Sequence, residues 1–212
     1  MNLKLALPLC GAFLLSQHLY GSVVSYSSRP LFLAALNNSV TTDFEAVTLG
    51  TYNTAAGLTE AGANYVPAPL AAGLTATDNC VSLANICLIG PAATNATFGY
   101  TRIHLPAGTN ALGMDLSGYQ GLPAPYEIRL STGETATGNL TGPFFAFDFA
   151  GVISSLPFSY ADIYIDFTPT NVGQPSLIDN LTYGSTVPEP SSIVLIASGL
   201  LAAGMSRLRA KR

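Results

Sequence analysis

Short alternating segments separated by turn residues constrain the fold of this chain most. Residues 160–167 place four apolar side chains on one face of an extended strand and two tyrosines and two aspartates on the other. Residues 144–149 place three phenylalanines on one side in the same way. Further strands are expected near residues 41–48, 71–77, 96–104, 110–117, 125–131 and 177–183. With glycine, proline and asparagine between these segments, the pattern predicts an all-β antiparallel β-sandwich with a jelly-roll order of strands.

One short helix is expected before these strands. Ser28 is a good N-cap, Pro30 suits the first helical turn, and Asn37 can adopt the left-handed conformation that ends a helix. Residues 28–38 are therefore predicted to be helical.

The first 25 residues have the order of a secretory signal peptide. Lys4 is followed by an apolar run over residues 5–15 and then by small residues. Cleavage is expected after Gly21 or after Ser25. The mature domain, residues 26–186, is long enough to form one domain with its own core.

The C-terminal segment, residues 187–212, combines a rigid hinge, an apolar run and a basic end. Pro188 and Pro190 prevent a helix from continuing upstream. Residues 191–206 carry no charge, and as a transmembrane helix they would span about 24 Å, less than the ~30 Å of a hydrocarbon core. A buried core helix is the alternative. A cytoplasmic C-terminus is favoured by the cations that follow, Arg207, Arg209, Lys211 and Arg212.

This segment resembles a known sorting signal. Its motif Pro188-Glu189-Pro190, its apolar run and its basic end occur in the order of the PEP-CTERM sorting signal of Gram-negative, exopolysaccharide-producing bacteria. The resemblance implies that an exosortase, a membrane transpeptidase-like enzyme, recognises the motif and removes the tail. The protein would then be held in the inner membrane transiently and end in the cell envelope or outside the cell. Tails of this kind have also been named after the C-terminus of ice-binding proteins, a label that describes the tail alone.

Three stretches of the domain itself are similar to PEP-CTERM ectodomains. Residues 149–159 match the pattern Phe-x-Gly-Val-x-Ser-x-x-Pro-Phe, with Ala150 where an aromatic residue or glycine is usual. Residues 43–45 and 178–184 also look like that group. This resemblance implies a lectin-like or carbohydrate-module-like sandwich and supports the fold more than a function.

The charge of the mature domain argues against nucleic acid as a partner. Three arginines against eleven carboxylates, with no lysine, give residues 26–186 a net charge near −8. Phosphate binding needs clustered cations, which this composition does not supply. The balance suits solubility outside the cell and contacts with divalent cations.

Two cysteines remain in the mature domain, Cys80 and Cys87. An even number of cysteines in an exported domain predicts a disulfide bond. Free thiols are the alternative. Metal ligation has less support, because only His104 could complete such a site.

Glu45 and Asp179 are candidate ligands of a structural Ca²⁺. They lie near the first and the last predicted strands, and sandwich modules often hold a calcium ion with carboxylates from those strands. Calcium takes six to eight oxygen ligands, of which carbonyl groups can supply most, so two carboxylates suffice. The alternative is a pair of ordinary exposed acids or turn caps.

The polar face of residues 160–167 is a candidate glycan-binding surface. Tyr160 and Tyr164 could stack against sugar rings, and Asp162 and Asp166 could accept hydrogen bonds from hydroxyl groups. The two aspartates would stand about 13 Å apart on one strand, too far for the carboxylate pair of a glycosidase. An ordinary solvated sheet face is the alternative, because tyrosine is also a good strand former.

The sequence shows no marked catalytic set. His104 is the only histidine of the mature domain, and no Gly-x-Ser-x-Gly elbow accompanies it. We therefore expect an exported cell-envelope or extracellular-matrix protein, sorted by exosortase, whose non-enzymatic β-sandwich associates with exopolysaccharide. The alternative is a secreted carbohydrate-active enzyme or a dedicated carbohydrate-binding module.

Overall fold

The computed structural model describes residues 22–52, 56–68, 74–80, 85–89, 100–118, 124–142, 146–165 and 176–186. Residues 1–21 of the predicted signal peptide lie outside this part of the chain. The whole C-terminal segment, with its motif, predicted transmembrane helix and basic end, also lies outside it. Among the residues described, no helix is both long and apolar enough to cross a membrane.

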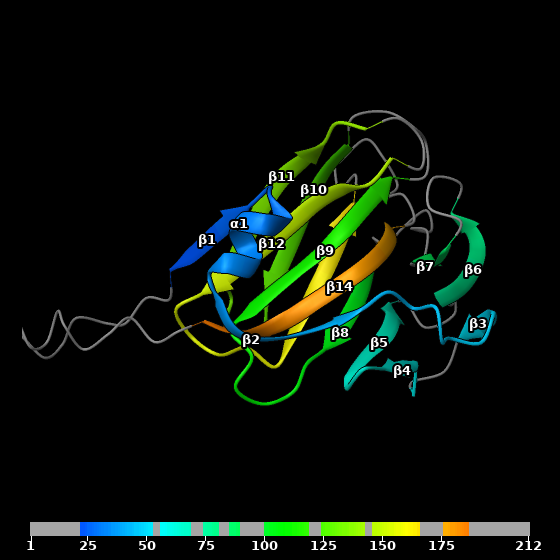
Figure 1. Cartoon of the computed structure of the whole chain (residues 1–212), viewed down its shortest axis with the longest axis horizontal. Helices are drawn as coiled ribbons and strands as arrows, with labels where there is room; N and C mark the ends of the chain where they lie inside the picture. The colour runs from blue at the N-terminus through cyan, green and yellow to red at the C-terminus, as the bar shows by residue number, and fades with distance from the viewer. Residues whose placement is uncertain are drawn as a thin grey trace, which may run out of the picture.

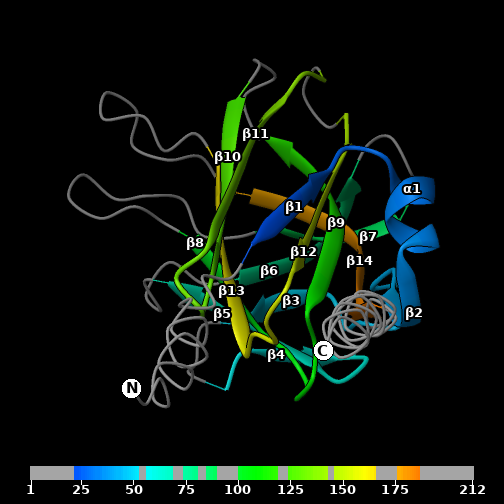
Figure 2. The same ribbon diagram turned by 90° about the vertical axis from the view of Figure 1, so that its left-hand side faces the viewer.

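Two antiparallel sheets form the two layers of the molecule (Figures 1 and 2). The eight-stranded sheet contains β1 (Val23–Tyr26), β2 (Leu36–Thr42), β3 (Gly50–Tyr52), β6 (Leu74–Cys80), β7 (Asn85–Ile89), β9 (Ala111–Gly118), β12 (Asp148–Ser154) and β14 (Ser176–Thr186). The six-stranded sheet contains β4 (Leu58–Glu60), β5 (Ala63–Ala68), β8 (Tyr100–His104), β10 (Ala124–Leu130), β11 (Thr135–Leu140) and β13 (Tyr160–Ile165). The single helix of the described residues is α1 (Arg29–Ala34).

The strand order brings together segments that are far apart in the chain. The eight-stranded sheet has the order β1-β12-β9-β14-β7-β6-β3, and β2 pairs with the second half of β14. The six-stranded sheet has the order β11-β10-β13-β8-β5-β4. Strand β14 therefore has β9 on one side and both β7 and β2 on the other.

The core lies between the inner faces of the two sheets. Ala161, Ile163 and Ile165 of β13 point into it and are at most 1% exposed, so the predicted alternation of this strand is confirmed through its last described residue. The facing sheet contributes, among others, Leu112, Met114, Leu116, Ile178 and Leu181. The expected all-β antiparallel two-sheet architecture is thus confirmed.

The helix is shorter than predicted. Pro30 lies in its first turn as expected, but Ser28 makes no side-chain capping hydrogen bond. Asn37 belongs to strand β2 and not to the helix end, so this part of the prediction is wrong. The reason is long-range pairing: residues 36–42 lie against the second half of β14, which overrides the local helix signals.

The strand expected at residues 41–48 also ends early. Strand β2 stops at Thr42 because the chain turns at Phe44, whose φ of 61° lies in the left-handed region. Asp43 supports the turn, since its Oδ1 accepts a hydrogen bond from the backbone N–H of Glu45 at 3.2 Å. The turn carries Glu45, a predicted cation ligand, out of the sheet.

Helix α1 covers the outer face of the eight-stranded sheet (Figure 2). Phe32 is fully buried beneath it, with its ring centroid 5.5 Å from that of Phe149. Two glycines make room for Phe32: a Cβ atom at Gly113 would lie 2.8 Å from its ring, and one at Gly151 would lie 3.0 Å from it. Gly113 of β9 and Gly151 of β12 therefore leave the space in which Phe32 packs against the sheet.

The first described strand overlaps the predicted signal peptide at all but its last residue. Strand β1 forms the edge of the eight-stranded sheet and pairs with β12, with Val23 opposite Ser154. Cleavage after Ser25 would remove most of this strand, whereas cleavage after Gly21 would keep it.

Candidate functional sites

The predicted glycan face lies on the outside of the six-stranded sheet. Tyr160, Asp162 and Tyr164 come from β13, whereas Asp166 lies outside the described residues. Asp162 is only 7% exposed. Arg102 of the neighbouring strand β8 donates to both of its carboxylate oxygens, from Nε at 2.7 Å and from Nη2 at 2.8 Å. The acceptor capacity of Asp162 is therefore largely used within the protein.

Arginine side chains also cover the tyrosine rings of this face. Cζ of Arg102 lies 4.1 Å from the ring centroid of Tyr160, and Cζ of Arg129 lies 4.3 Å from that of Tyr164. Tyr100 packs against Tyr164, with ring centroids 4.8 Å apart. Burial raises the pKa of the Tyr164 hydroxyl above its ordinary value. These rings already have partners within the protein.

Two carboxylates of this face come from neighbouring strands, Glu127 on β10 and Asp162 on β13. Each forms an ion pair, Glu127 with Arg129 and Asp162 with Arg102. A glycosidase needs one carboxyl group that donates a proton and a second that acts as nucleophile or base. Because both of these described carboxylates are held by arginines, they do not form a free acid–base pair.

A groove lies where the edge strands β1 and β11 approach each other. Its volume is about 360 Å³, which falls within the usual range of small-ligand sites. Its lining combines aromatic and polar side chains, among them Tyr26, Tyr126, Phe149, Asn139 and Asp148. Sequence reasoning missed this groove, and no local motif could have indicated it, because the lining comes from four separate segments of the chain.

Gly138 shapes the groove. A Cβ atom at this position would lie 2.5 Å from the ring of Tyr126, so the glycine allows that ring to lie across β11. Tyr126 is 8% exposed, and burial raises the pKa of its hydroxyl. Asp148 is held by backbone groups: its Oδ2 accepts hydrogen bonds from the N–H of Thr141 at 2.5 Å and of Gly142 at 3.2 Å.

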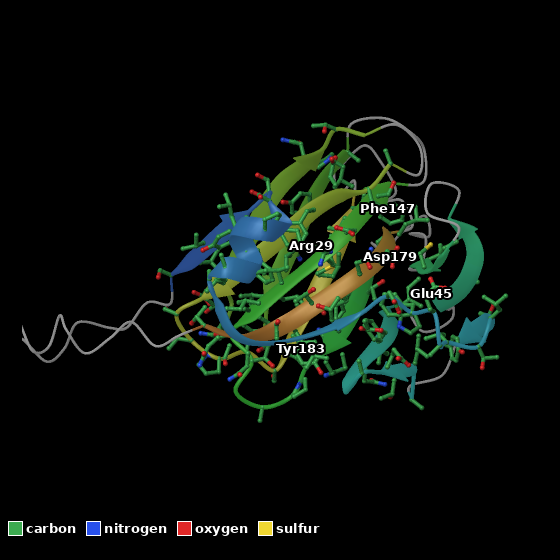
Figure 3. The ribbon with its side chains drawn as sticks, viewed as in Figure 1. Arg29, Glu45, Phe147, Asp179 and Tyr183 are labelled. Carbon is green, nitrogen blue, oxygen red and sulfur yellow. The ribbon has the colours of Figure 1, made fainter. Side chains whose placement is uncertain are left out.

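Asp179, one of the predicted cation ligands, is fully buried on β14 (Figure 3). Its Oδ1 accepts a hydrogen bond from the N–H of Asn180 at 2.6 Å, whereas its Oδ2 has no hydrogen-bond partner. Asp115 stands directly opposite on β9. Burial is the main reason that the pKa of Asp179 is raised to about 6. The charges of Asp115, Glu45 and Asp43 act in the same direction.

Glu45, the other predicted ligand, lies in the turn after β2, and Figure 3 shows it together with Asp179. Arg29 of α1 binds the two neighbours of Asp179. Its Nη2 donates to Oδ1 of Asp115 and to the carbonyl oxygen of Asn180, each at 2.8 Å. Within the described ranges, no three His, Cys, Asp or Glu side chains gather as a metal site would need. The calcium site stays a prediction that rests on two carboxylates.

The predicted disulfide partners lie on paired strands, Cys80 on β6 and Cys87 on β7. Cys87 is fully buried and disulfide-bonded. It lies in a small apolar cluster with Leu177, against which Phe147 packs (Figure 3). The side chain of Cys80 is not among those that the structure describes, so the pairing stays a prediction.

Two solved structures show what the fold is similar to. The K2 cleaved adhesin domain of Lys-gingipain (Kgp) is 12% identical, with a TM-score of 0.45 over 69% of this chain and 99% of that chain. A family 29 carbohydrate-binding module is 14% identical, with a TM-score of 0.37 over 73% of this chain and 97% of that chain. Because both scores and both identities are low, neither likeness carries a conclusion about function.

The C-terminal segment has a clearer relation to known proteins than the domain has. A search of curated proteins found no match to this chain. Residues 186–210, however, match the PEP-CTERM protein-sorting motif. That range includes Pro188, Glu189, Pro190 and the whole apolar run, and it ends after Arg209. The chain therefore carries a PEP-CTERM protein-sorting motif, as its sequence predicted, and this tail indicates export and sorting to the cell envelope or the extracellular space.

Proposed function

We propose that this protein is exported through the inner membrane, held there transiently by residues 191–206, and then processed by an exosortase at its sorting motif. The PEP-CTERM match supports this sorting. The fold is compatible with removal of the tail, because β14 ends at Thr186, next to the motif, and both sheets form without the residues beyond it. The product would be an acidic, lysine-free sandwich in the envelope or the matrix.

This sorting can be tested in a bacterium that has an exosortase. The full chain should lose its tail and leave the membrane fraction, as measured by intact mass and cell fractionation. A Glu189→Gln variant, which keeps the apolar run and the basic end, should stay uncut in the membrane. Deletion of the exosortase gene should give the same result for the unchanged chain. Equal mass and equal location of the variant and the unchanged chain would contradict the proposal.

We further propose that the domain is a non-enzymatic module that binds exopolysaccharide in the groove between β1 and β11. The observation that carries this proposal is the lining of the groove. Tyr26 and Tyr126 line it with aromatic rings, whereas the ring of Phe149 is covered by Phe32 and Arg29. Asn139 and Asp148 offer groups that bind hydroxyls. A strongly acidic domain repels acidic polymers, so we infer a neutral sugar chain as the ligand.

A jelly-roll or lectin-like strand order fits this proposal. From β8 to β14 the chain passes from one sheet to the other at every connection except the β10–β11 hairpin. Such crossings place strands that follow each other in the chain on opposite sides of the core.

The alternative of a secreted carbohydrate-active enzyme has less support. Among the described residues that line the groove, Asp148 is the one carboxylate, whereas glycosidases use two. Incubation of the processed protein with exopolysaccharide distinguishes the two functions, because release of new reducing ends would show an enzyme.

Binding can be measured by affinity electrophoresis of the processed protein in gels that contain exopolysaccharide. Tyr26→Ala and Asn139→Ala should weaken binding about tenfold each, or roughly 1.4 kcal/mol. Thr135→Ala is the matched control, because Thr135 is exposed on the same strand as Asn139 but lies outside the groove lining. Unchanged binding by both groove variants would contradict this site. A selective loss in Tyr160→Ala would assign binding to the outer face of the six-stranded sheet.

A structural divalent cation is a second proposal, and Asp179 is the observation that favours it. A buried carboxylate oxygen without a hydrogen-bond partner is unfavourable. Ca²⁺ bound by this oxygen, by Glu45 and by carbonyl groups would satisfy it. Added Ca²⁺ should raise the Tm of the unchanged protein and of a Glu60→Gln control, but not that of Asp179→Asn. An unchanged Tm of the wild-type protein would contradict the site.

A further inference from the structure

Both ends of the described domain meet at one end of the sandwich. The N–H of Ser22 donates to Oγ of Ser155 at 3.0 Å, and the N–H of Ser155 donates to the carbonyl oxygen of Ser22 at 2.9 Å. Asn110 holds the other end: its Oδ1 accepts from the N–H of Thr186 at 2.9 Å, and its Nδ2 donates to Oγ1 of Thr186 at 3.0 Å. The carbonyl oxygen of Asn110 also accepts from the N–H of Ser154 at 2.9 Å. Asn110 thus connects the two ends.

We call this end of the molecule the junction pole and define it as Ser22, Thr186 and two loops, residues 105–110 and residues 154–159. Figure 1 shows that β1 begins and β14 ends on the same side of the molecule. The four segments contain no Asp, Glu, Lys or Arg.

The junction pole exposes small and apolar groups. Pro106, Ala107 and Pro157 are exposed. Glu134 reaches the pole from the turn between β10 and β11, where its Oε2 accepts a hydrogen bond from Oγ of Ser154 at 2.5 Å and its Oε1 is buried without a hydrogen-bond partner. Because this carboxylate is already withdrawn from the surface, the loops of the pole themselves bring no charged side chain to a lipid interface.

The sorting tail leaves the junction pole on a very short connection. Residues 187–190 separate Thr186 from the apolar run that begins at Ser191. The five Cα–Cα steps from Thr186 to Ser191 span at most about 18 Å when fully extended. While the apolar run is inserted, the pole therefore remains within about this distance of the membrane.

We propose that the junction pole lies against the phospholipid headgroups of the inner membrane until the tail is removed. The inference rests on the proposed anchoring by residues 191–206. The short connection brings the pole to the bilayer, and the loops that form its surface carry no charged side chain of their own. The described carboxylates other than Glu134 lie outside these loops, and they favour the orientation in which they remain in water.

The orientation can be measured with single tryptophans, because the chain has none of its own. Ala107→Trp places a probe in the junction pole. Thr141→Trp is the control, because Thr141 is exposed and follows β11 at the opposite end of the sandwich. Each full-length variant is reconstituted into phosphatidylcholine vesicles with and without brominated acyl chains, which quench tryptophan on contact. We expect quenching of the Ala107→Trp probe to exceed that of the Thr141→Trp probe at least about twofold.

Flotation of the same vesicles separates two kinds of failure. Full-length protein that does not float with the vesicles would overturn the anchoring and, with it, the orientation. Protein that floats but shows equal or reversed quenching would overturn the orientation and leave the anchoring intact. Matching melting curves of the two variants exclude misfolding as the cause. Chains truncated after Thr186 should show no quenching at either probe.

Discussion

Arg102 and Asp162 form a two-pronged ion pair across β8 and β13, with Nε and Nη2 of the arginine 2.7 Å and 2.8 Å from the two carboxylate oxygens. The guanidinium also lies over the ring of Tyr160, with its Cζ 4.1 Å from the ring centroid. One arginine therefore neutralises a buried carboxylate and covers an aromatic ring on the same sheet face.

Removal of this arginine should destabilise the fold. Arg102→Ala leaves Asp162, which is 7% exposed, without its ion partner, so we expect the free energy of unfolding to fall by about 2–3 kcal/mol. Arg129→Ala is the matched comparison: it leaves Glu127, which is 9% exposed, without its ion partner, but it removes a side chain that is itself 50% exposed in its ion pair, so it should lower the same free energy by less than Arg102→Ala does. Urea unfolding measures both values, and equal losses would contradict this account.

Asp179 should make stability depend on pH. Its pKa is raised from 3.8 to about 6 in the folded protein, so the folded state binds more protons than the unfolded state between these values. The free energy of unfolding should therefore fall as pH rises through this window. Asp179→Asn should remove the dependence and stabilise the protein near neutral pH by about 2 kcal/mol. Melting in chelator-containing buffer from pH 4 to pH 7 tests this, and parallel curves for variant and wild type would contradict it.

Helix α1 should depend on one phenylalanine. Phe32 is fully buried, so Phe32→Ala should lower the free energy of unfolding by about 3 kcal/mol. Leu31→Ala is the control, since Leu31 is its neighbour and is 66% exposed, and a change within about 0.5 kcal/mol is expected. Similar effects of the two substitutions in urea unfolding would show that the helix does not contribute through this contact.

The mature protein should begin at Ser22. Strand β1 spans Val23–Tyr26 and pairs with β12, and cleavage after Ser25 would leave only its last residue. Intact-mass measurement and N-terminal sequencing of the exported protein identify the first residue. A mature chain that starts at Tyr26 would show that β1 does not belong to the processed fold.

Cys80 and Cys87 should be linked to each other. Non-reducing peptide mapping should recover one cross-linked peptide pair, and reduction should lower the free energy of unfolding by roughly 2–3 kcal/mol. Cys87→Ser should give the same loss without reductant. Quantitative labelling of both thiols in the unfolded, unreduced protein would contradict the bond.

The predictable parts of this fold are those with a local cause. The alternation of Ala161, Ile163 and Ile165 follows from the period of a strand, and these residues are buried as expected. Strand β2 could not be predicted, because only the distant β14 makes residues 36–42 extended. The local helix signals hold for residues 29–34, whereas from residue 36 onward the pairing with β14 overrides them.

The candidate sites divide in the same way. The sorting motif is a local sequence pattern, so it could be found without a structure. The partners of Asp162 and Tyr164 could not, because Arg102 and Arg129 come from other strands whose register no local pattern indicates. No sequence pattern indicates the groove, because the residues that line it come from strands of both sheets.

The position of β14 has a consequence for biosynthesis. It is the last described strand, yet it lies inside the larger sheet and is the shared neighbour of β2, β7 and β9. That sheet cannot be completed until residue 186 has been synthesised. The last residues of the domain thus supply a central strand just before the sorting tail follows, so the tail is attached directly to the strand that completes the larger sheet.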